Sequence, residues 1–308
     1  MRLRGLLSFP LTPFTEDGQA VNFEVLVEHL REQIDARPGA LFVACGTGEF
    51  TALSLEEYRD VVSTAVQTAA GTGVPVFAGA GGGPQVARAF ARAATDAGAD
   101  GLLLLPPYLV EAPPAGLVRY IRFVADATPL PIVVYQRANA VLDPDTSVQL
   151  LDIPTIVGIK DGRGDVDAML RIVTAVRMSG HPRAAEFGFL NGLPTAELSV
   201  KAYEAIGVDS YSSAVLDFAP RIALRFYCAV REQDDHAMNA LLTSFYLPLV
   251  ALRDKVPGGA VSLIKAGATL HGLAMGPVRP PLLTATEDQM VALAGIVWDG
   301  MTTLETLP

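Results

Sequence analysis

Cysteine is scarce in this chain, and tryptophan occurs once. The 308 residues include two cysteines, Cys45 and Cys228, which lie far apart and within apolar surroundings. Two distant cysteines do not make a disulfide framework, so we predict that both are buried free thiols, as expected in a reducing compartment. Half of the residues are hydrophobic, which is ample for a large core.

Long apolar runs and clusters of basic residues are also missing. No apolar run reaches about 18 residues, the length that a membrane-spanning helix needs. Residues 1–5 lack the apolar stretch of a signal peptide, and we therefore expect a soluble, cytoplasmic protein that does not bind membranes. The formal net charge is -10, and this charge argues against a nucleic acid partner.

Histidine is rare and is not spaced as in metal-binding motifs. All the histidines fall on predicted helices or helix ends, without ligand spacing: His29, His181, His236 and His271. Metal sites in proteins bring several ligands to one point. We therefore predict no metal site and interpret these side chains as surface or packing residues.

Short apolar runs alternate regularly with helical segments along most of the chain. Eight runs are predicted to be strands: 6–9, 40–44, 74–78, 100–105, 131–136, 155–160, 186–190 and 208–213. Helices are predicted between them at 23–37, 54–70, 84–97, 115–127, 144–151, 165–178 and 194–206. Asn22, Ser54 and Asp165 supply helix caps. The count predicts a closed (β/α)8 TIM barrel, because a doubly wound sheet would need a phosphate-binding fingerprint at its first crossover.

The last part of the chain shows no strand pattern. After about residue 218, helices are predicted at 218–233, 235–253, 260–272 and 286–300. We predict a barrel catalytic domain over residues 1–220 and a C-terminal helical region over residues 221–308. We interpret the helical region as an appendage of the barrel and not as a separate functional module.

The ends of the predicted strands carry a specific set of polar side chains. In a TIM barrel the active site lies at the C-terminal ends of the strands. That rule collects Gly46, Thr47, Gly48, Glu49, Tyr108, Tyr135, Gln136, Arg137, Lys160, Asn191, Ser212 and Ser213. The set contains one amine, two phenols, a guanidinium and several hydroxyls, but no histidine. The carboxylates at the strand ends are Glu49 and Asp161, which follows Lys160.

Lys160 ends a strand that is otherwise apolar. Burial of an ammonium without a partner is costly, so the position of this lysine needs an explanation. A desolvated amine would be nucleophilic and could form a Schiff base with a carbonyl substrate. Alternatively, Lys160 reaches solvent or pairs with Asp161. Tyr135 ends the neighbouring strand, where it is either a proton relay for the lysine or an aromatic cover of the barrel.

Two further groups at the strand ends could bind anions. The Gly46-Thr47-Gly48 turn has little side-chain bulk, and its backbone N–H groups and the Thr47 hydroxyl could hold a carboxylate. The glycines could equally serve only the dihedral angles of a tight turn. Arg137 could hold a second carboxylate through two hydrogen bonds, or it could pair with an acid at the rim.

Four of these segments, in this order, resemble the N-acetylneuraminate lyase/dihydrodipicolinate synthase superfamily of class I Schiff-base aldolases and lyases. The segments are 9–14 (FPLTPF), 46–49 (GTGE), Tyr135 and 158–161 (GIKD). The resemblance covers essentially all of the chain. Longer stretches resemble the branch of 5-dehydro-4-deoxyglucarate dehydratases within that superfamily: 135–140, 160–165, 191–197, 211–214 and 276–281.

The resemblance implies a TIM barrel, a reaction and a role for several residues. The substrate would be a six-carbon 2-oxo-3-deoxy diacid, which would lose water and carbon dioxide to give 2,5-dioxopentanoate. Lys160 would form the Schiff base with no other cofactor, and Tyr135 would shuttle protons. Gly46 and Thr47 would hold the carboxylate beside the imine. The distal carboxylate or hydroxyls would be held by Arg137, Asn191 or Ser212. Related proteins are commonly homotetramers or homodimers.

The chain departs from the superfamily pattern at several positions. Gln136-Arg137-Ala138 follows Tyr135 where aldol members usually have Asn-x-Pro, and Leu109 follows Tyr108 where a second tyrosine is common. Gly46 stands where many members carry a hydroxyl, so a carboxylate there would depend more on backbone N–H groups. Two alternatives therefore stay open: a retro-aldol lyase on a related 2-oxo-3-deoxy acid, and a non-catalytic sugar-acid-binding barrel.

Overall fold

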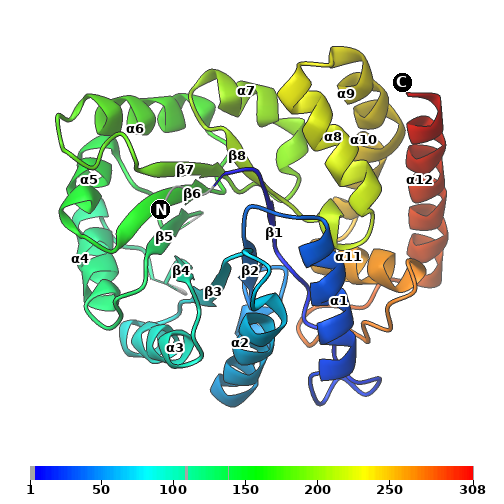
Figure 1. The fold of residues 1–308 in the computed structure, drawn as a ribbon, viewed down its shortest axis with the longest axis horizontal. Coiled ribbons are helices and arrows are strands. Elements are labelled where there is room, and N and C mark those ends of the chain that lie inside the picture. The colour runs from blue at the N-terminus through cyan, green and yellow to red at the C-terminus, as the bar shows by residue number, and fades with distance from the viewer. Residues whose placement is uncertain (1–3, 108–109, 138, 308) are drawn as a thin grey trace.

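Eight parallel strands close into a barrel in the computed structural model, which describes residues 4–107, 110–137 and 139–307. Each strand pairs with its neighbours in chain order, and β1 closes the ring against β8. The strands are β1 Leu6–Ser8, β2 Leu41–Val43, β3 Val76–Ala80, β4 Gly101–Leu104, β5 Ile132–Gln136, β6 Ile156–Asp161, β7 Gly188–Asn191 and β8 Ser210–Ser213. The predicted (β/α)8 architecture is confirmed (Figure 1).

A helix follows each strand and packs around the barrel (Figure 1). These helices are α1 Phe23–Asp35, α2 Leu55–Ala69, α3 Pro84–Asp96, α4 Pro114–Ala125, α5 Pro144–Gln149, α6 Val166–Met178, α7 Val200–Ala205 and α8 Pro220–Glu232. The predicted caps are confirmed: Asn22, Ser54 and Asp165 each accept a hydrogen bond from a backbone N–H of the first helical turn. Ser54 also forms a capping box with Glu57.

The C-terminal helices lie to one side of the barrel, and α12 forms the edge of the molecule on that side (Figure 1). They are α9 Asp235–Leu241, α10 Leu247–Arg253, α11 Gly259–Leu270 and α12 Glu287–Thr306. The predicted helix over 235–253 is confirmed as one continuous helical run, in which a π-helical turn at Leu242–Tyr246 joins α9 to α10. The predicted helix over 194–206 is instead a 3-10 turn, Ala196–Leu198, followed by the short α7.

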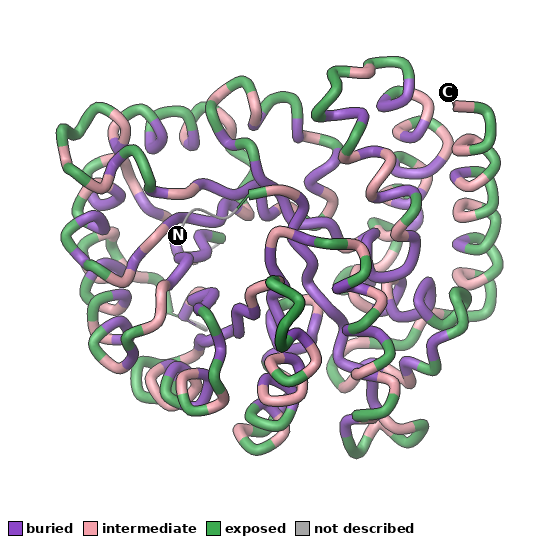
Figure 2. The backbone as a smooth tube through the Cα atoms, in the orientation of Figure 1, coloured by how far each residue is buried: buried purple, intermediate pink, exposed green. Residues whose placement is uncertain are grey.

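The hydrophobic core has an inner and an outer layer. Inside the barrel, ten buried residues form one cluster: Leu7, Phe9, Ala40, Phe42, Cys45, Phe77, Leu103, Val133, Tyr135 and Leu190. A larger cluster fills the space between the strands and α1–α6. Figure 2 shows the consequence, since nearly all strand residues are buried and the outer helix faces are exposed.

The C-terminal region shares a core with the barrel. A third buried cluster joins Leu6 of β1 and Tyr211 of β8 to residues of α8–α11, including Leu263, and to Leu293 of α12. Helix α8 also continues the barrel pattern, since it directly follows β8. Residues on both sides of position 220 therefore pack in one core. The division of the chain into two domains at this position stays a prediction.

The cysteines differ from each other in their surroundings. Both are free, as predicted, and Cys45 is buried inside the barrel. The prediction that Cys228 is buried was wrong, because this thiol lies on the exposed face of α8. The apolar residues near Cys228 in the sequence do not show whether this side chain lies on the buried or the exposed face of α8. Over the described ranges, no helix is both long and apolar enough to cross a membrane.

Candidate active site

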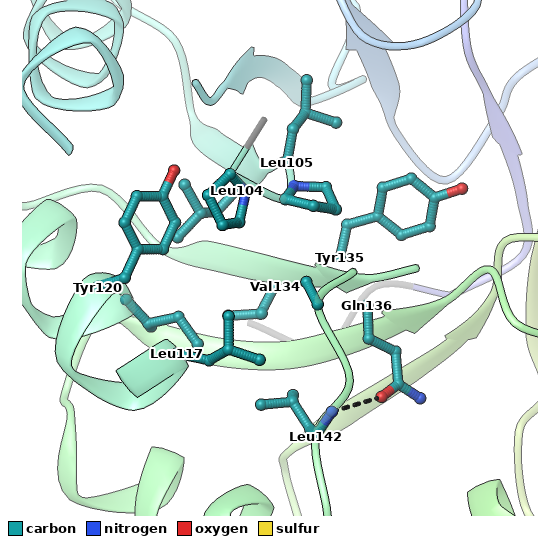
Figure 3. Close-up of a pocket in the computed structure, with 12 residues that line it drawn as sticks. Leu104, Leu105, Leu117, Tyr120, Val134, Tyr135, Gln136 and Leu142 are labelled. Atoms are coloured by element: carbon teal, nitrogen blue, oxygen red, sulfur yellow. Dashed lines mark hydrogen bonds between the residues drawn. The ribbon is translucent and has the colours of Figure 1, made fainter. Parts of the chain in front are cut away.

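Lys160 and Tyr135 lie side by side at the C-terminal end of the barrel. They are register partners on the adjacent strands β6 and β5. Because side chains alternate along a strand, Tyr135 faces the barrel interior while Gln136 faces the surrounding helices. Figure 3 shows the Tyr135 ring pointing away from Leu117 and Tyr120 of α4, whereas Gln136 turns toward Leu142 and accepts a hydrogen bond from its backbone N–H at 3.3 Å.

The Lys160 amine is enclosed by aromatic rings. Its residue is 7 % exposed, and Nζ lies 3.9 Å from the centroid of the Phe9 ring and 4.5 Å from that of Tyr135. Burial lowers the pKa of this amine to about 7, while Cys45 acts to raise the pKa and the Arg137 guanidinium to lower it. A large fraction of the amine is therefore neutral and nucleophilic near pH 7.

Asp161 does not pair with Lys160, because it leaves β6 on the opposite face. Its Oδ1 accepts a hydrogen bond from Gln136 Nε2 at 2.9 Å, and its Oδ2 accepts one from the Tyr203 hydroxyl. The backbone N–H groups of Arg163 and Gly164 also donate to this carboxylate. Asp161 thus stabilises the loop after β6. The alternative in which Lys160 reaches solvent or pairs with Asp161 is excluded by its burial and by this orientation.

The Tyr135 hydroxyl lies at the mouth of the barrel. It donates a hydrogen bond to the carbonyl of Gly192, which follows β7, at 3.3 Å. Burial raises the pKa of the phenol, and the nearby Arg137 guanidinium opposes this shift. The hydroxyl is therefore protonated at rest and able to act first as an acid.

The turn after β2 leaves open space beside the barrel mouth. Gly46 is exposed and Thr47 is half-buried. Apart from its chain neighbours, no described residue has an atom within 4 Å of the position that a Gly46 Cβ would occupy. Gly48 is tightly enclosed, since its Cβ would lie 3.0 Å from the carbonyl oxygen of Pro10. Thr12 Oγ1 donates to the Gly48 carbonyl at 2.8 Å. The two glycines therefore differ: Gly48 is needed for a close backbone approach, and Gly46 leaves room for a ligand.

The three residues predicted to hold the distal end of a substrate lie in different places. Arg137 is exposed at the end of β5, where its backbone pairs with Ala140. Ser212 is 9 % exposed and is the register partner of Leu7, an interior residue, so it faces the same interior. Asn191 is placed elsewhere, and Tyr108 lies outside the described residues.

Asn191 is directed away from the barrel mouth. It is the register partner of Asp161, which faces the helices. Its Nδ2 donates to Ser199 Oγ at 2.9 Å and to the Ala196 carbonyl at 3.3 Å. The amide therefore stabilises the loop that leads to α7. The structure thus directs this amide into the loop, whereas the sequence placed it at the barrel mouth, and a role of Asn191 in substrate binding stays a prediction.

The sequence did not identify the contacts that Phe9 and two glycines make with the site. The Phe9 ring stacks on Phe42 with centroids 4.7 Å apart, and its face is directed at Lys160. A Cβ on Gly162 would lie 2.6 Å from the Tyr135 hydroxyl, and one on Gly192 would lie 2.4 Å from Lys160 Cε. The sequence offered one sign of these contacts, which is that each glycine directly follows the end of a strand.

Neither carboxylate at the strand ends is free to act on a substrate. Asp161 is bonded as described above, and Glu49 forms a buried ion pair with Lys265 of α11 at 2.7 Å. In the ranges that the structure describes, no three His, Cys, Asp or Glu side chains are grouped as metal ligands would be. The chemistry available at the barrel mouth is that of an amine, a phenol, hydroxyls, the Arg137 guanidinium and backbone N–H groups.

The sequence of this chain matches the model of one protein family over nearly its whole length. The model of the dihydrodipicolinate synthetase family matches residues 2–298. The chain belongs to this family. The resemblance inferred from its motifs is thereby confirmed at the family level.

Individual relatives in this family support a closer resemblance. The chain is 50 % identical over 301 residues to a probable 5-dehydro-4-deoxyglucarate dehydratase of Streptomyces avermitilis, covering 98 % of this chain and 95 % of that protein. It is 51 % identical over 296 residues to a protein of the same name from Streptomyces griseus, covering 96 % and 91 %. The expected resemblance to that dehydratase branch is thus confirmed.

Solved structures of the dihydrodipicolinate synthetase family share the fold over nearly the whole chain. A dihydrodipicolinate synthase from Oceanobacillus iheyensis superimposes with a TM-score of 0.87 at 23 % identity, covering 99 % of this chain and 98 % of that one. YagE, a prophage protein of E. coli K12 in complex with pyruvate, gives a TM-score of 0.84 at 26 % identity, covering 97 % and 98 %. The helical region is therefore matched along with the barrel.

Proposed function

We propose that this protein is a decarboxylating dehydratase that converts 5-dehydro-4-deoxy-D-glucarate to 2,5-dioxopentanoate, carbon dioxide and water in sugar-acid degradation. The observation that carries the proposal is the Lys160 amine, buried between the Phe9 and Tyr135 rings with its pKa lowered to about 7. The names of the relatives supply the substrate, and the site supplies a nucleophile suited to its ketone.

The first step is condensation of Lys160 with the ketone. The neutral amine adds to the carbonyl carbon, and the carbinolamine then loses water to give a protonated imine. The Tyr135 phenol, protonated at rest, supplies the proton that leaves with this water. The Phe9 face beside Nζ stabilises the cationic imine, because a cation is attracted to the negative face of an aromatic ring.

Dehydration follows from the electron demand of the imine. The cationic nitrogen acidifies the neighbouring CH2, and the Tyr135 phenolate formed in the first step accepts its proton. The resulting enamine expels the β-hydroxyl, which leaves as water with the proton from Tyr135. One tyrosine thus donates, accepts and donates again, which requires a hydroxyl close to Nζ but no second acid–base group.

Decarboxylation uses the same electron sink. After dehydration, the imine is conjugated with a carbon–carbon double bond that reaches the carbon next to the hydroxylated C5. The bond between C5 and the distal carboxylate breaks, and its electron pair moves through the conjugated system to nitrogen. Carbon dioxide leaves, and the C5 enol becomes an aldehyde as its hydroxyl loses a proton and C4 gains one from water. Protonation of C3, also from water, turns the enamine back into an imine, and hydrolysis of this imine releases 2,5-dioxopentanoate and restores Lys160.

The substrate carboxylates would be held at two places. The Gly46–Thr47 turn offers backbone N–H groups and the Thr47 hydroxyl to the carboxylate beside the ketone. Arg137 and Ser212 would hold the distal carboxylate and a hydroxyl, which is supported by the exposure of Arg137 at the rim and by the inward direction of Ser212. Assembly into homodimers or homotetramers stays a prediction, which light scattering would check.

Trapping of the imine tests the proposal directly. Incubation with the diacid and borohydride should add the reduced substrate to Lys160, located by mass spectrometry of peptides. Lys160→Ala should abolish both the adduct and turnover while the circular dichroism spectrum is retained. A matched lysine control is Lys201→Ala, because Lys201 is exposed and pairs with Asp235 away from the site. Turnover by Lys160→Ala would refute the Schiff-base mechanism.

Product analysis separates the proposal from its alternatives. A dehydratase releases carbon dioxide and a semialdehyde, whereas a retro-aldol lyase releases pyruvate by breaking a carbon–carbon bond. A binding protein would bind the diacid without forming either product. The buried amine and its tyrosine neighbour favour an enzyme over a binding protein.

Replacement of Tyr135 tests the proton shuttle. Tyr135→Phe keeps the ring beside Lys160 but removes the hydroxyl, so we expect turnover to fall by about 10² to 10⁴. Imine trapping with pyruvate should be slowed less, because trapping requires only the first proton transfer. Steady-state kinetics and trapping rates measured on one preparation would check this. Unchanged turnover would show that Tyr135 serves only packing.

A further inference from the structure

A second buried lysine, Lys265 of α11, contacts the residue that ends the Gly46–Thr47 turn. Its Nζ lies 2.7 Å from Glu49 Oε1, and the two side chains are 3 % and 2 % exposed. The same ammonium donates to the Pro277 carbonyl at 2.9 Å and lies 4.0 Å from the centroid of the Phe14 ring. The C-terminal helical region thus places a fully enclosed charge against the barrel mouth.

Glu49 is held at its other oxygen as well. Its Oε2 accepts a hydrogen bond from the backbone N–H of Arg279 at 2.9 Å. Glu49 has a φ of 53°, a left-handed conformation that residues other than glycine rarely adopt unless their surroundings hold them. Two contacts from the C-terminal region thus hold the side chain of a residue in this conformation.

The backbone of Glu49 closes the turn. Its N–H donates to the Gly46 carbonyl at 3.2 Å, so the position of Glu49 helps to set the orientation of the Gly46 and Thr47 peptides. A change in the Glu49 side chain would move these N–H groups. Displacements of a fraction of an ångström matter there, because the binding of a carboxylate by N–H groups depends on distance and angle.

Stability alone does not explain the pair. Burial of two charges is costly, and apolar side chains of similar volume often hold helices together at least as well. An ion pair at one oxygen of Glu49 and a hydrogen bond at the other instead fix one geometry. We propose that Lys265 and Glu49 are positioning residues, whose ion pair orients the Gly46–Thr47 turn and so sets the affinity for the carboxylate beside the reacting ketone.

This inference rests on the proposed Schiff-base function, and two ketones of different charge test it separately. Pyruvate carries a carboxylate beside its ketone, and acetone does not. Lys265→Met should lower the efficiency of borohydride trapping by pyruvate about 10-fold to 100-fold, the range for a misplaced binding group. Trapping by acetone, which does not use the turn, should change little. For the diacid, KM should rise more than kcat falls.

Two further variants make the result decisive. Lys201→Met removes an exposed lysine that pairs with Asp235, and it should leave the ratio of pyruvate to acetone trapping unchanged. Glu49→Gln keeps the side-chain shape but removes the charge, and it should lower the same ratio even if Lys265→Met does not fold.

The outcomes distinguish the two proposals. An equal loss of trapping by both ketones, or an unchanged ratio in Lys265→Met and Glu49→Gln, would refute the positioning role. If neither ketone is trapped on Lys160 of the unaltered protein, the proposed function itself would fail.

Discussion

At the scale of single residues, the environment of Lys160 decides what the amine can do. Water is replaced by the Phe9 and Tyr135 rings, and the carboxylate of Asp161 is on the other face of β6. A carboxylate partner inside the barrel would have kept the amine protonated. Burial without such a partner lowers the pKa, and the aromatic faces still accommodate the cationic imine.

The pH dependence of imine formation should report this environment. The folded-state pKa of Lys160 is lowered to about 7, so the amine is protonated below this pH and neutral above it. Trapping by pyruvate and borohydride should therefore fall by about tenfold per pH unit below that pH and level off above it. A midpoint near the ordinary lysine value of 10.5 would contradict the burial of the amine.

Phe9 should matter through its ring face and not only through its volume. Phe9→Leu removes the aromatic face 3.9 Å from Nζ but keeps an apolar side chain. The protonated amine loses a cation–π contact, so the midpoint of the trapping profile should move to lower pH by up to about one unit. A shift toward higher pH would instead show that Phe9 acts by excluding water.

At the scale of elements, the strand ends owe their geometry to alternation and to small residues in the following turns. Lys160 and Tyr135 meet because β5 and β6 are in register, while Asp161 and Gln136 meet on the outer face for the same reason. The turns after β6 and β7 then run close over these side chains. Glycine is required there because the space for a Cβ is already occupied.

Gly192→Ala should impair the site although it removes no functional group. The added Cβ would lie 2.4 Å from Lys160 Cε and 2.9 Å from the Asp161 carbonyl oxygen, so the lysine must move. We expect trapping by pyruvate to fall about tenfold or more, since small displacements of reacting groups are costly. Gly188→Ala in β7, the strand that precedes Gly192, is the control, because the nearest atom to its added Cβ would lie at an ordinary 3.5 Å. Equal effects of the two variants would count against this argument.

At the scale of the whole molecule, the C-terminal region stabilises the barrel as well as extending it. The Arg279 guanidinium donates to the carbonyls of Gly18, Gln19 and Ala52, which belong to the loops after β1 and β2. It also forms two hydrogen bonds with the Glu57 carboxylate of α2, at 2.6 and 2.8 Å. One side chain from the end of the chain thus joins three segments of its first quarter.

Arg279→Ala should therefore lower the free energy of unfolding by about 2 kcal/mol, because several partly buried acceptors and the Glu57 carboxylate lose their donor together. Urea unfolding followed by circular dichroism would measure this change. Arg171→Ala is the control, since Arg171 and its partner Asp167 are 68 % and 71 % exposed on α6. An equally small effect of both variants would show that Arg279 does not stabilise the contact between the helical region and the barrel.

The sequence predicted the strands and helices well because their signals are local. Apolar runs, caps at Asn22, Ser54 and Asp165, and turn residues lie within a few positions of the structure they determine. It also predicted that Lys160 and Tyr135 would be neighbours, since successive strands of a barrel are adjacent. The distal groups were harder: Asn191 follows a strand end, but alternation directs its amide to Ser199 and away from the barrel mouth.

By itself the sequence determined the barrel, the order of its strands and the lysine and tyrosine at its mouth, because periodicity and strand order suffice for these. The tertiary structure decided what surrounds individual side chains. It enclosed Lys160 against Phe9, exposed Cys228 and brought Lys265 to Glu49. Such contacts join distant segments, as Arg279 and Glu49 do across 230 residues, and depend on how helices pack on the closed barrel, which no local pattern encodes.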